Sequence, residues 1–270
     1  MSIPPGVDVT KPSPARVYDC LLGGTNNFPA DRAAAALMKS MAPELVDAAS
    51  ANRGFHQRAA RWIAEQGIRQ FIDIGSGLPT VGNTHEVVRK VWPDARVVYV
   101  DYDPMVLEHG SYLLADDDQS EVVQADLRNP DKVLGSEAVQ RLIEFGQPAA
   151  VLVTAVLHFV SDADDPAGLV ARYAAPLAPG SYLALSHLTA DQKPDAAVAA
   201  IVEAGRRSAG GSWMRSRDEV RALVSGLEIV PPYDGAAADV SWVGLWGCED
   251  PAEADSEGSR WLYSAVARKG

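Results

Sequence analysis

Residues 70–77 read Gln-Phe-Ile-Asp-Ile-Gly-Ser-Gly, and this stretch decides the fold. An apolar run of strand type leads through an aspartate into a turn with two glycines. Glycine at a strand exit lets the backbone turn sharply, and it lets a ligand approach main-chain N–H groups without meeting a Cβ atom. The stretch therefore predicts a nucleotide-type ligand site at the carboxyl end of a first parallel strand, with Asp73, Gly75, Ser76 and Gly77 as candidate binding residues.

The residues after the turn separate two classes of nucleotide site. A dinucleotide fingerprint has Gly-x-Gly-x-x-Gly leading directly into a helix, so that the pyrophosphate sits on the helix N-terminus. Here the third glycine position holds Thr80, preceded by Pro79, which weakens the dinucleotide interpretation. Asp73 instead suits a ligand with a positive end. Acidic-x-Gly-x-Gly resembles the first motif of class I S-adenosylmethionine (SAM) methyltransferases, in which this turn holds the methionine part of the cofactor. Thr80, beside the turn, is a further candidate cofactor residue.

An acidic residue follows a second predicted strand. Residues 96–100, Arg-Val-Val-Tyr-Val, form a β-branched and aromatic run that stops at Asp101, 24 residues beyond the second glycine. An acid at the end of a second parallel strand is placed to accept both hydroxyls of a ribose. We assign this role to Asp101, with Tyr102 beside it. Asp103 is assigned mainly to the N-cap of the helix that begins near Pro104, because Asp favours caps and Pro the first helical turn.

A third strand end carries another acid. Residues 122–127 read Val-Val-Gln-Ala-Asp-Leu, a short strand that ends at Asp126. In the methyltransferase pattern this acid accepts a hydrogen bond from the adenine amino group, and Leu127 offers its backbone N–H to the ring. Any one acid could be a solvated loop residue. Three at successive strand ends favour a SAM site.

Size and charge indicate one enzyme domain without a nucleic-acid partner. The chain has 270 residues, 47% of them hydrophobic, and no Pro/Gly/Ser linker or repeat divides it, so we expect a single domain over 1–270. The net charge of −12, from 24 basic and 36 acidic residues, repels a phosphate backbone. No basic stripe carries interleaved aromatic residues, so no nucleic-acid partner is expected.

The cysteines and the first residues of the chain indicate the cellular compartment. Cys20 and Cys248 lie far apart and outside any metal-spaced cluster, which indicates free thiols in a reducing compartment. Residues 1–14 lack the basic start and apolar run of a signal peptide, and no window reaches membrane-spanning length. The sequence predicts a cytoplasmic protein without a membrane partner, and it leaves the oligomeric state open.

Strand-like and helix-like segments alternate along the chain. Predicted strands lie within 70–77 and at 96–100, 122–127, 149–154, 181–186, 227–230 and 261–267. Predicted helices lie at 55–66, within 81–92, and at 104–114, 167–177 and 216–224. Seven strands alternating with helices predict an α/β fold: a doubly wound, mostly parallel, Rossmann-like sheet with helices on both faces. Ligands of such folds bind outside the carboxyl ends of the strands, where the motifs lie.

Longer motifs carry a more specific resemblance. They are Pro-Ser-Pro-Ala-Arg-Val-Tyr-Asp-Cys-Leu-Leu-Gly-Gly-Thr-Asn-Asn-Phe at 12–28, Ala-Asn-Arg-Gly-Phe at 51–55, Gly-Leu-Pro-Thr-Val-Gly-Asn-Thr-His-Glu at 77–86, Val-Asp-Tyr-Asp-Pro at 100–104 and Val-Leu-His-Phe at 156–159. From about residue 12 to 269 the chain is similar to the actinobacterial SAM-dependent methyltransferase family once catalogued only as a domain of unknown function, DUF574. The resemblance implies a class I fold and SAM as cofactor; it does not imply a substrate.

The segment 12–54 precedes the predicted sheet, and we interpret it as an N-terminal helical lid. Glycine and amide residues, Asn27 among them, form a loop that can close over a ligand. Tyr18 supplies an apolar side chain to this loop. The alternative is that this segment packs on the domain as an ordinary helix. Arg53 is the candidate partner of the cofactor carboxylate, because a planar guanidinium suits a carboxylate. The alternative for Arg53 is a surface position.

Histidines supply the candidate acid–base groups. His158 follows the fourth strand, where an acceptor would approach the methyl group, so it is the candidate base or orienting residue. The alternative for His158 is a satisfied core residue. His85 lies beside the glycine loop and could touch either ligand, and His187 is a second candidate. His56 and His109 fall in helical patterns and are interpreted as surface residues. No His/Cys/carboxylate grouping has metal spacing, so no metal is expected.

Two insertions are expected to form the acceptor side. Residues 191–214 add a helix and a Gly-Gly-Ser-Trp turn, and residues 231–260 carry several aromatic residues, which suit flat or apolar small molecules. The alternative for any single tryptophan is packing between the insertion and the sheet. The leading hypothesis is a SAM-dependent methyltransferase acting on a small molecule. A SAM-binding sensor without turnover is the alternative. An NAD-dependent oxidoreductase is disfavoured by Thr80 and by the absence of a Tyr-x-x-x-Lys pair.

Overall fold

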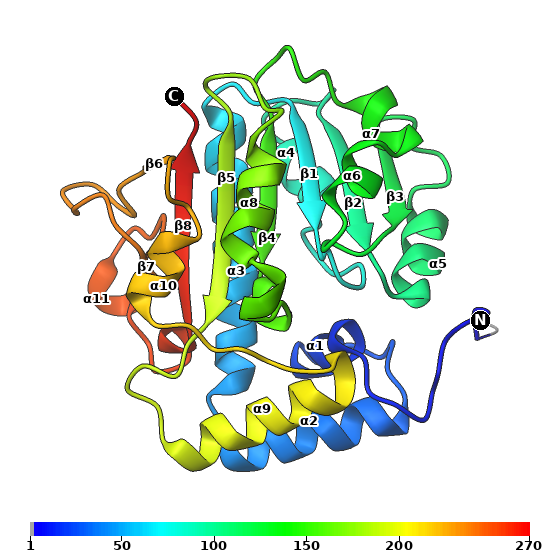
Figure 1. Ribbon diagram of the computed structural model, residues 1–270, viewed down its shortest axis with the longest axis vertical. Coiled ribbons are helices and arrows are strands. Elements are labelled where there is room, and N and C mark those ends of the chain that lie inside the picture. The colour runs from blue at the N-terminus through cyan, green and yellow to red at the C-terminus, as the bar shows by residue number, and fades with distance from the viewer. Residues whose placement is uncertain (1–2) are drawn as a thin grey trace.

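A mostly parallel sheet runs through the centre of the computed structural model, which describes residues 3–270 (Figure 1). Its strands are β1 (Gln70–Ile74), β2 (Arg96–Asp101), β3 (Ser120–Gln124), β4 (Ala150–Thr154), β5 (Tyr182–Leu188), β6 (Glu228–Ile229), β7 (Ser241–Trp242) and β8 (Leu262–Arg268). The strand order is β3-β2-β1-β4-β5-β8-β6, with β7 also paired to β8. β1 to β5 are parallel, and β8 is antiparallel to β5, β6 and β7. The predicted doubly wound sheet is confirmed.

The sheet reverses its winding direction between β1 and β4. From β1 the chain winds outward through β2 to β3, then returns to place β4 on the other side of β1. All five residues of β1 are buried, as both faces of a doubly wound sheet are covered. Open α/β sheets bind ligands in the crevice at such a switch point. Residues 75–77 and 154–156 leave the sheet here.

Helices cover both faces (Figure 1). One hydrophobic core packs α6 (Pro130–Leu134), α7 (Glu137–Leu142), α8 (Pro166–Ala174) and α10 (Arg217–Ala222) against the sheet. The other packs α3 (Leu45–Glu65) and α4 (Thr84–Val88) against the opposite face. α5 (Pro104–Leu113) packs beside β3, and α11 (Pro251–Ala254) lies in the segment before β8. The 3₁₀ turns are η1 (Leu157–Phe159), η2 (Asp162–Asp164) and η3 (Ser259–Trp261).

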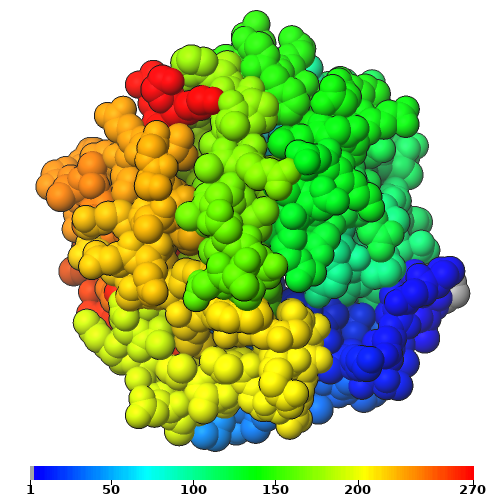
Figure 2. Space-filling view, in the orientation of Figure 1, coloured from blue at the N-terminus to red at the C-terminus, as the bar shows by residue number. Residues whose placement is uncertain are grey.

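Three further helices lie across the carboxyl ends of the parallel strands. They are α1 (Pro14–Leu21), α2 (Pro29–Met41) and α9 (Asp195–Ala209), called here the cover helices. Figure 1 shows them below the arrowheads of β1, β2 and β5, with α9 alongside α2. In Figure 2 the surface of α9 meets that of the N-terminal segment on the face in view. The cover combines segments that are 154 residues apart in sequence, since α2 ends at residue 41 and α9 begins at 195.

Several elements differ from the sequence-based expectation. The sequence predicts no helix at α6, α7 or α11, and β3 ends at Gln124 and not at Asp126. α3 begins at Leu45, ten residues before the predicted start at 55, because the alanines of its first turns blur the apolar stripe that reveals a helix. β7 adds an eighth strand of two residues inside the segment 231–260, where the sequence pattern is irregular. The ends of β1 and β2, which carry the glycine turn and Asp101, lie where the sequence predicts them.

Candidate active site

A pocket lies between the carboxyl ends of the strands and the cover helices. It encloses about 170 Å³. Residues 75–77, Asp101, Tyr102 and Leu127 line the part that we call the cofactor end. Residues of the cover helices and of neighbouring segments line the part that we call the cover end: Val17, Leu21, Met38, Ile201, Ala204 and Leu262. The two parts belong to one continuous pocket.

The glycine turn has the geometry that its sequence predicts. Gly75 and Gly77 have φ of +69° and +67°, a region that glycine enters without strain. The N–H of Gly75 donates to the carbonyl of Val100 at 2.7 Å, which ties the turn to β2. A Cβ on Gly75 would lie 2.5 Å from Cγ2 of Val156, whereas one on Gly77 would meet nothing within 4 Å. Gly75 is therefore required by packing, and Gly77 leaves room toward the pocket.

Asp101 is held in place by two backbone N–H groups. Its Oδ2 accepts from the N–H of Gly77 at 2.9 Å, and its Oδ1 accepts from the N–H of Asp103 at 3.0 Å. Burial raises the pKa of the Asp101 carboxyl to about 6. Each carboxylate oxygen keeps a free lone pair, so the group can accept two hydroxyls from a ligand. Tyr102 lines the pocket beside it.

Asp103 is a helix cap, as the sequence indicates. Its Oδ1 accepts from the N–H of Met105 at 2.9 Å at the start of α5. Its Oδ2 accepts from the hydroxyl of Ser13, and the guanidinium of Arg16 lies 3.6 Å away. The same carboxylate therefore joins the start of α1 to the sheet.

The two candidate residues after the third strand differ in position: Leu127 lines the pocket, and Asp126 does not. Leu127 lines the pocket, and its carbonyl accepts from the hydroxyl of Tyr173 at 2.7 Å. Asp126 is not among the lining residues. Its two oxygens accept from Nε of Arg128, each at 3.0 Å, and this ion pair lowers the pKa of the Asp126 carboxyl.

Arg53 lines the pocket from α3. Its Nη2 donates to the carbonyl of Gly82 at 2.9 Å, and its Nε is buried without a hydrogen-bond partner. The hydroxyl of Ser76, on the glycine turn, is also buried and unpaired. Buried polar groups are nearly always hydrogen-bonded in proteins, so unpaired ones that line a pocket indicate a ligand.

His56 contradicts its interpretation as a surface residue. It is only 3% exposed and lines the pocket one helical turn after Arg53. Its Nε2 lies 2.8 Å from the hydroxyl of Thr84, and its Nδ1 lies 3.0 Å from that of Thr154. Thr84 in turn donates to Asp73 at 2.6 Å, and Asp73 itself does not line this pocket. The i, i+3 spacing from Arg53 is the sequence signal that could have identified His56.

Three other predicted cofactor residues lie outside the lining of the pocket. His85 faces Tyr99, with Nδ1 2.6 Å from the phenol oxygen. The backbone N–H of Thr80 donates to the side chain of Asn83 at 3.0 Å. The amide of Asn27 donates to the side chain of Asp19 at 2.8 Å.

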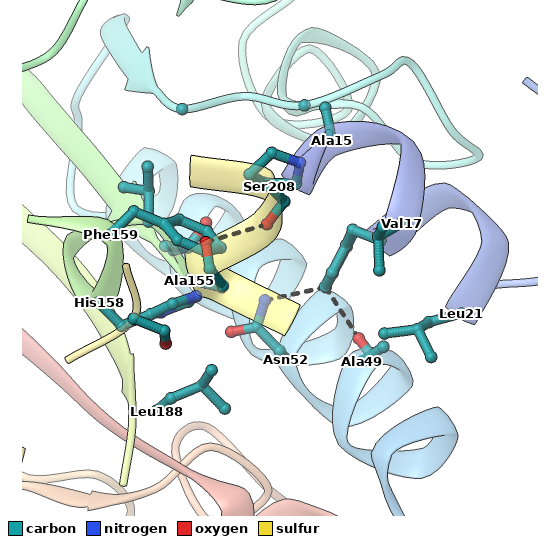
Figure 3. A pocket seen from close by; sticks show the side chains of 18 of the residues that line it. Ala15, Val17, Leu21, Ala49, Asn52, Ala155, His158, Phe159, Leu188 and Ser208 are labelled. Carbon is teal, nitrogen blue, oxygen red and sulfur yellow. Dashed lines mark hydrogen bonds between the residues drawn. The ribbon is translucent and has the colours of Figure 1, made fainter. Parts of the chain in front are cut away.

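His158 lines the pocket from η1 (Figure 3). Its ring points into the pocket toward Asn52, and its Nδ1 is buried without a hydrogen-bond partner. Burial lowers its pKa well below the ordinary value, so the ring is neutral near pH 7. The hydroxyl of Ser212, which also lines the pocket, is likewise buried and unpaired. These two groups are the free polar atoms on this side of the pocket.

His187, the second candidate, has a structural environment. It is fully buried, and Nη1 of Arg215 donates to its Nε2 at 2.8 Å. Arg215 also donates to the carbonyls of Leu157 and Val160, at 3.2 and 2.9 Å. His187 and Arg215 therefore support η1, which carries His158, and His187 is not a lining residue of the pocket.

The cover end is mostly apolar. Figure 3 shows Val17 and Leu21 of α1 opposite His158 and Phe159, with Asn52 of α3 between them and Ala49 beside Leu21. One polar bridge crosses it: the hydroxyl of Tyr18 donates to the carbonyl of Ala49 at 2.9 Å and accepts from the amide of Asn52 at 2.9 Å. This bridge attaches α1 to α3.

The two insertions differ in their relation to the pocket. Segment 191–214 contributes α9 and lines the pocket through Ile201, Ala204 and Ser208. Within residues 3–270, no residue of 231–260 lines it, so this pocket does not support the expected acceptor role of that segment. Its aromatic residues pack elsewhere: Trp246 lies edge-on to Phe55, and Trp242 stacks on Tyr263.

No helix within 3–270 is long and apolar enough to cross a membrane. No three His, Cys, Asp or Glu side chains in that range form a group that could hold a metal ion.

The fold and the strand-end site define a class I SAM methyltransferase. The chain belongs to the S-adenosyl methyltransferase family, whose model matches residues 2–270. It is similar over 98% of both chains, at 43% identity and a TM-score of 0.90, to a Thermobifida fusca YX protein described as a candidate methyltransferase. A DUF574 family protein from Streptomyces avermitilis MA-4680 is 36% identical, with a TM-score of 0.88, over 97% of this chain and 99% of that one. A search of curated proteins found no match. The protein is an enzyme that uses SAM, and its methyl acceptor is not identified by these relatives.

Proposed function

We propose that the enzyme methylates a small, largely apolar molecule that binds at the cover end of the pocket. The observation that carries this proposal is the continuity of the pocket from the glycine turn to the cover helices. A sensor that only binds SAM needs the cofactor end alone. A second compartment with a neutral histidine in its wall supports turnover.

The residues at the cofactor end fit SAM. Arg53 has a spare donor for a carboxylate, Asp101 has two spare lone pairs for ribose hydroxyls, and the glycine turn leaves the backbone open. Bound SAM supplies a methyl group already activated on a sulfonium. The protein then has to position the acceptor and exclude water, and a base is needed only when the acceptor arrives protonated.

The cover end fits an apolar acceptor with one polar group. Its walls come from alanine, leucine, isoleucine and methionine side chains, which exclude water from the reacting atoms. Nδ1 of neutral His158 can accept a hydrogen bond from the polar group or take its proton. The nearby Ser212 hydroxyl offers a further hydrogen bond.

A substitution on α9 tests the acceptor compartment. Ala204 lines the cover end and is 7% exposed, so Ala204→Trp fills the compartment while leaving the strand-end residues in place. Val202, on the same helix and 39% exposed, gives the matched control Val202→Trp. We expect Ala204→Trp to retain SAM binding in calorimetry and to lose methyl transfer, and Val202→Trp to retain both.

The acceptor class is tested with methyl-labelled SAM. The protein is incubated with a low-molecular-mass metabolite extract and, separately, with protein and nucleic acid from the same cells. We expect label in the small-molecule fraction of the first reaction. Label found only in precipitable macromolecules would contradict the proposal.

A further inference from the structure

A row of hydrogen-bonded side chains runs from the sheet interior to the pocket wall. Asp73 lies in β1, Thr84 begins α4, His56 belongs to α3, and Thr154 ends β4. Thr84 lies 2.6 Å from Asp73, His56 lies 2.8 Å from Thr84, and Thr154 lies 3.0 Å from His56. The first three are at most 3% exposed, and only His56 and Thr154 line the main pocket.

The protons in this row can point in one direction only. The Asp73 carboxylate accepts, so the single hydroxyl proton of Thr84 is donated to it. Thr84 must then accept from Nε2 of His56. Burial lowers the pKa of His56 to about 4, so the ring is neutral and carries one proton. With that proton on Nε2, Nδ1 has to accept the hydroxyl proton of Thr154.

This arrangement of protons fixes which hydrogen bonds the Thr154 hydroxyl can form with a ligand. Its proton is committed to His56, so toward the pocket this oxygen offers lone pairs alone. Hydrogen bonds in a chain polarise one another, and the chain ends on a buried negative charge at Asp73. The Thr154 oxygen can therefore accept a hydrogen bond from an N–H group of a ligand. A positively charged donor forms the strongest such bond.

A candidate partner for a carboxylate, Arg53, lines the same pocket. Arg53 precedes His56 by three residues on the same face of α3, and its buried Nε is unpaired. An unpaired guanidinium N–H in the same pocket as an oxygen that only accepts matches an α-amino acid, which carries a carboxylate and an ammonium on one carbon.

We infer that the Thr154 hydroxyl oxygen accepts from the α-ammonium group of SAM, that Arg53 binds the α-carboxylate, and that His56 and Thr84 are positioning residues for Thr154. The inference rests on the SAM site of the proposed function. It assigns Asp73 an indirect role: the carboxylate sets the direction of the chain and does not touch the ligand.

Two nucleosides separate this inference from a general role in the fold. S-adenosylhomocysteine has the amino-acid end of SAM, and 5′-methylthioadenosine has the same nucleoside without it. Thr154→Val keeps the shape of the side chain and removes the hydroxyl. By calorimetry we expect this variant to bind S-adenosylhomocysteine roughly 10- to 100-fold more weakly, the range for a hydrogen bond to a charged group, and methylthioadenosine unchanged.

The positioning role is tested from the far end of the row. Thr84→Val removes the acceptor for Nε2–H of His56, at a residue that does not line the main pocket. We expect a smaller loss for S-adenosylhomocysteine than in Thr154→Val, and none for methylthioadenosine. Nitrogen-15 NMR of the imidazole in the wild-type protein should show His56 protonated at Nε2, and the variant should lose this preference.

The outcomes are distinguishable. If the wild-type protein binds neither nucleoside, the SAM site itself is wrong. If Thr154→Val weakens both nucleosides equally, or neither, while thermal unfolding shows the variant folded, the inference about Thr154 is overturned and the SAM site stands. A wild-type His56 protonated at Nδ1 would overturn the direction of the chain.

Discussion

The two ends of the pocket differ in the chemical groups that line them and in the elements that supply those groups. At the cofactor end, backbone N–H groups and carboxylates follow directly after β1 and β2, within the short stretches 75–77 and 101–103. At the cover end, apolar side chains converge from α1, α2, α3 and α9, which are far apart in sequence. The first end depends on the sheet and should be rigid. The second depends on helix packing, so substitutions there should alter the acceptor without altering the cofactor.

The largest expected separation of the two ends comes from His158→Ala. The ring lines the pocket from η1 with Nδ1 unpaired, and a base or orienting group acts on the acceptor in the transition state. We expect the methyl-transfer rate to fall roughly 10²- to 10⁴-fold with SAM affinity nearly unchanged, from rate measurements and calorimetry. His109→Ala, on α5 and outside the pocket, is the control. A parallel loss of SAM affinity would assign His158 to the cofactor end.

Asp101→Ala is the corresponding change at the other end. Because the carboxylate can accept two ribose hydroxyls, we expect SAM binding to weaken by roughly 1.5 to 3 kcal/mol in calorimetry. Asp126→Ala is the matched variant at the next strand end. Its carboxylate is already paired with Arg128 and does not line the pocket, so we expect a smaller loss. Equal losses would mean that Asp126 leaves Arg128 to bind the adenine.

The pH dependence of SAM affinity gives a smaller effect at the same residue. Burial raises the pKa of the Asp101 carboxyl to about 6, and ribose hydroxyls bind the ionised form. Affinity is then full well above pH 6 and falls as the pH falls through that value, to about tenfold weaker at pH 5 than at pH 7. Calorimetry at both pH values measures this, and Asp101→Asn should remove the step.

The raised pKa of Asp101 has the opposite effect on the stability of the unliganded protein, which falls as the pH rises. A carboxyl whose folded pKa is raised above its unfolded value, 3.8, stabilises the fold below that value, and this contribution is lost as the pH rises through about 6. SAM should therefore raise the melting temperature more above pH 6 than below it. An equal rise at pH 5 and pH 7 would argue against Asp101 as the titrating group.

The contrast between the ends also explains how far the sequence could predict the site. Gly75, Gly77 and Asp101 are visible because a strand exit is a local pattern, and the strand-end position follows from the parallel sheet. His85 and Thr80 lie close in sequence to the turn but do not line the pocket. The His85 side chain is hydrogen-bonded to the Tyr99 hydroxyl, and the backbone N–H of Thr80 donates to the Asn83 side chain. Proximity in sequence does not specify where a side chain points.

Residues joined across distant elements were not predictable in this way. The sequence places His56 on the surface, because a single histidine in a helical pattern carries no sign of burial. Its partners Thr84 and Thr154 lie 28 and 98 residues away along the chain. α9 lines the pocket, whereas the aromatic segment 231–260 packs against the sheet, and composition alone did not distinguish the two insertions.

The smallest expected effect tests how firmly the cover is attached. The Tyr18 hydroxyl joins α1 to α3 through Ala49 and Asn52, so Tyr18→Phe removes this bridge without changing the apolar wall. We expect the free energy of unfolding to fall by about 1 kcal/mol in denaturant titrations, the usual net value of a hydrogen bond. The KM for the acceptor should rise by a few-fold at most, with SAM affinity unchanged, because the bridge lies at the cover end. Tyr112→Phe, at a tyrosine that is 76% exposed, should change neither quantity. A loss of SAM affinity in Tyr18→Phe would show instead that the cover helices and the cofactor end act as one unit, and the division of the pocket into a rigid and an adjustable end would fail.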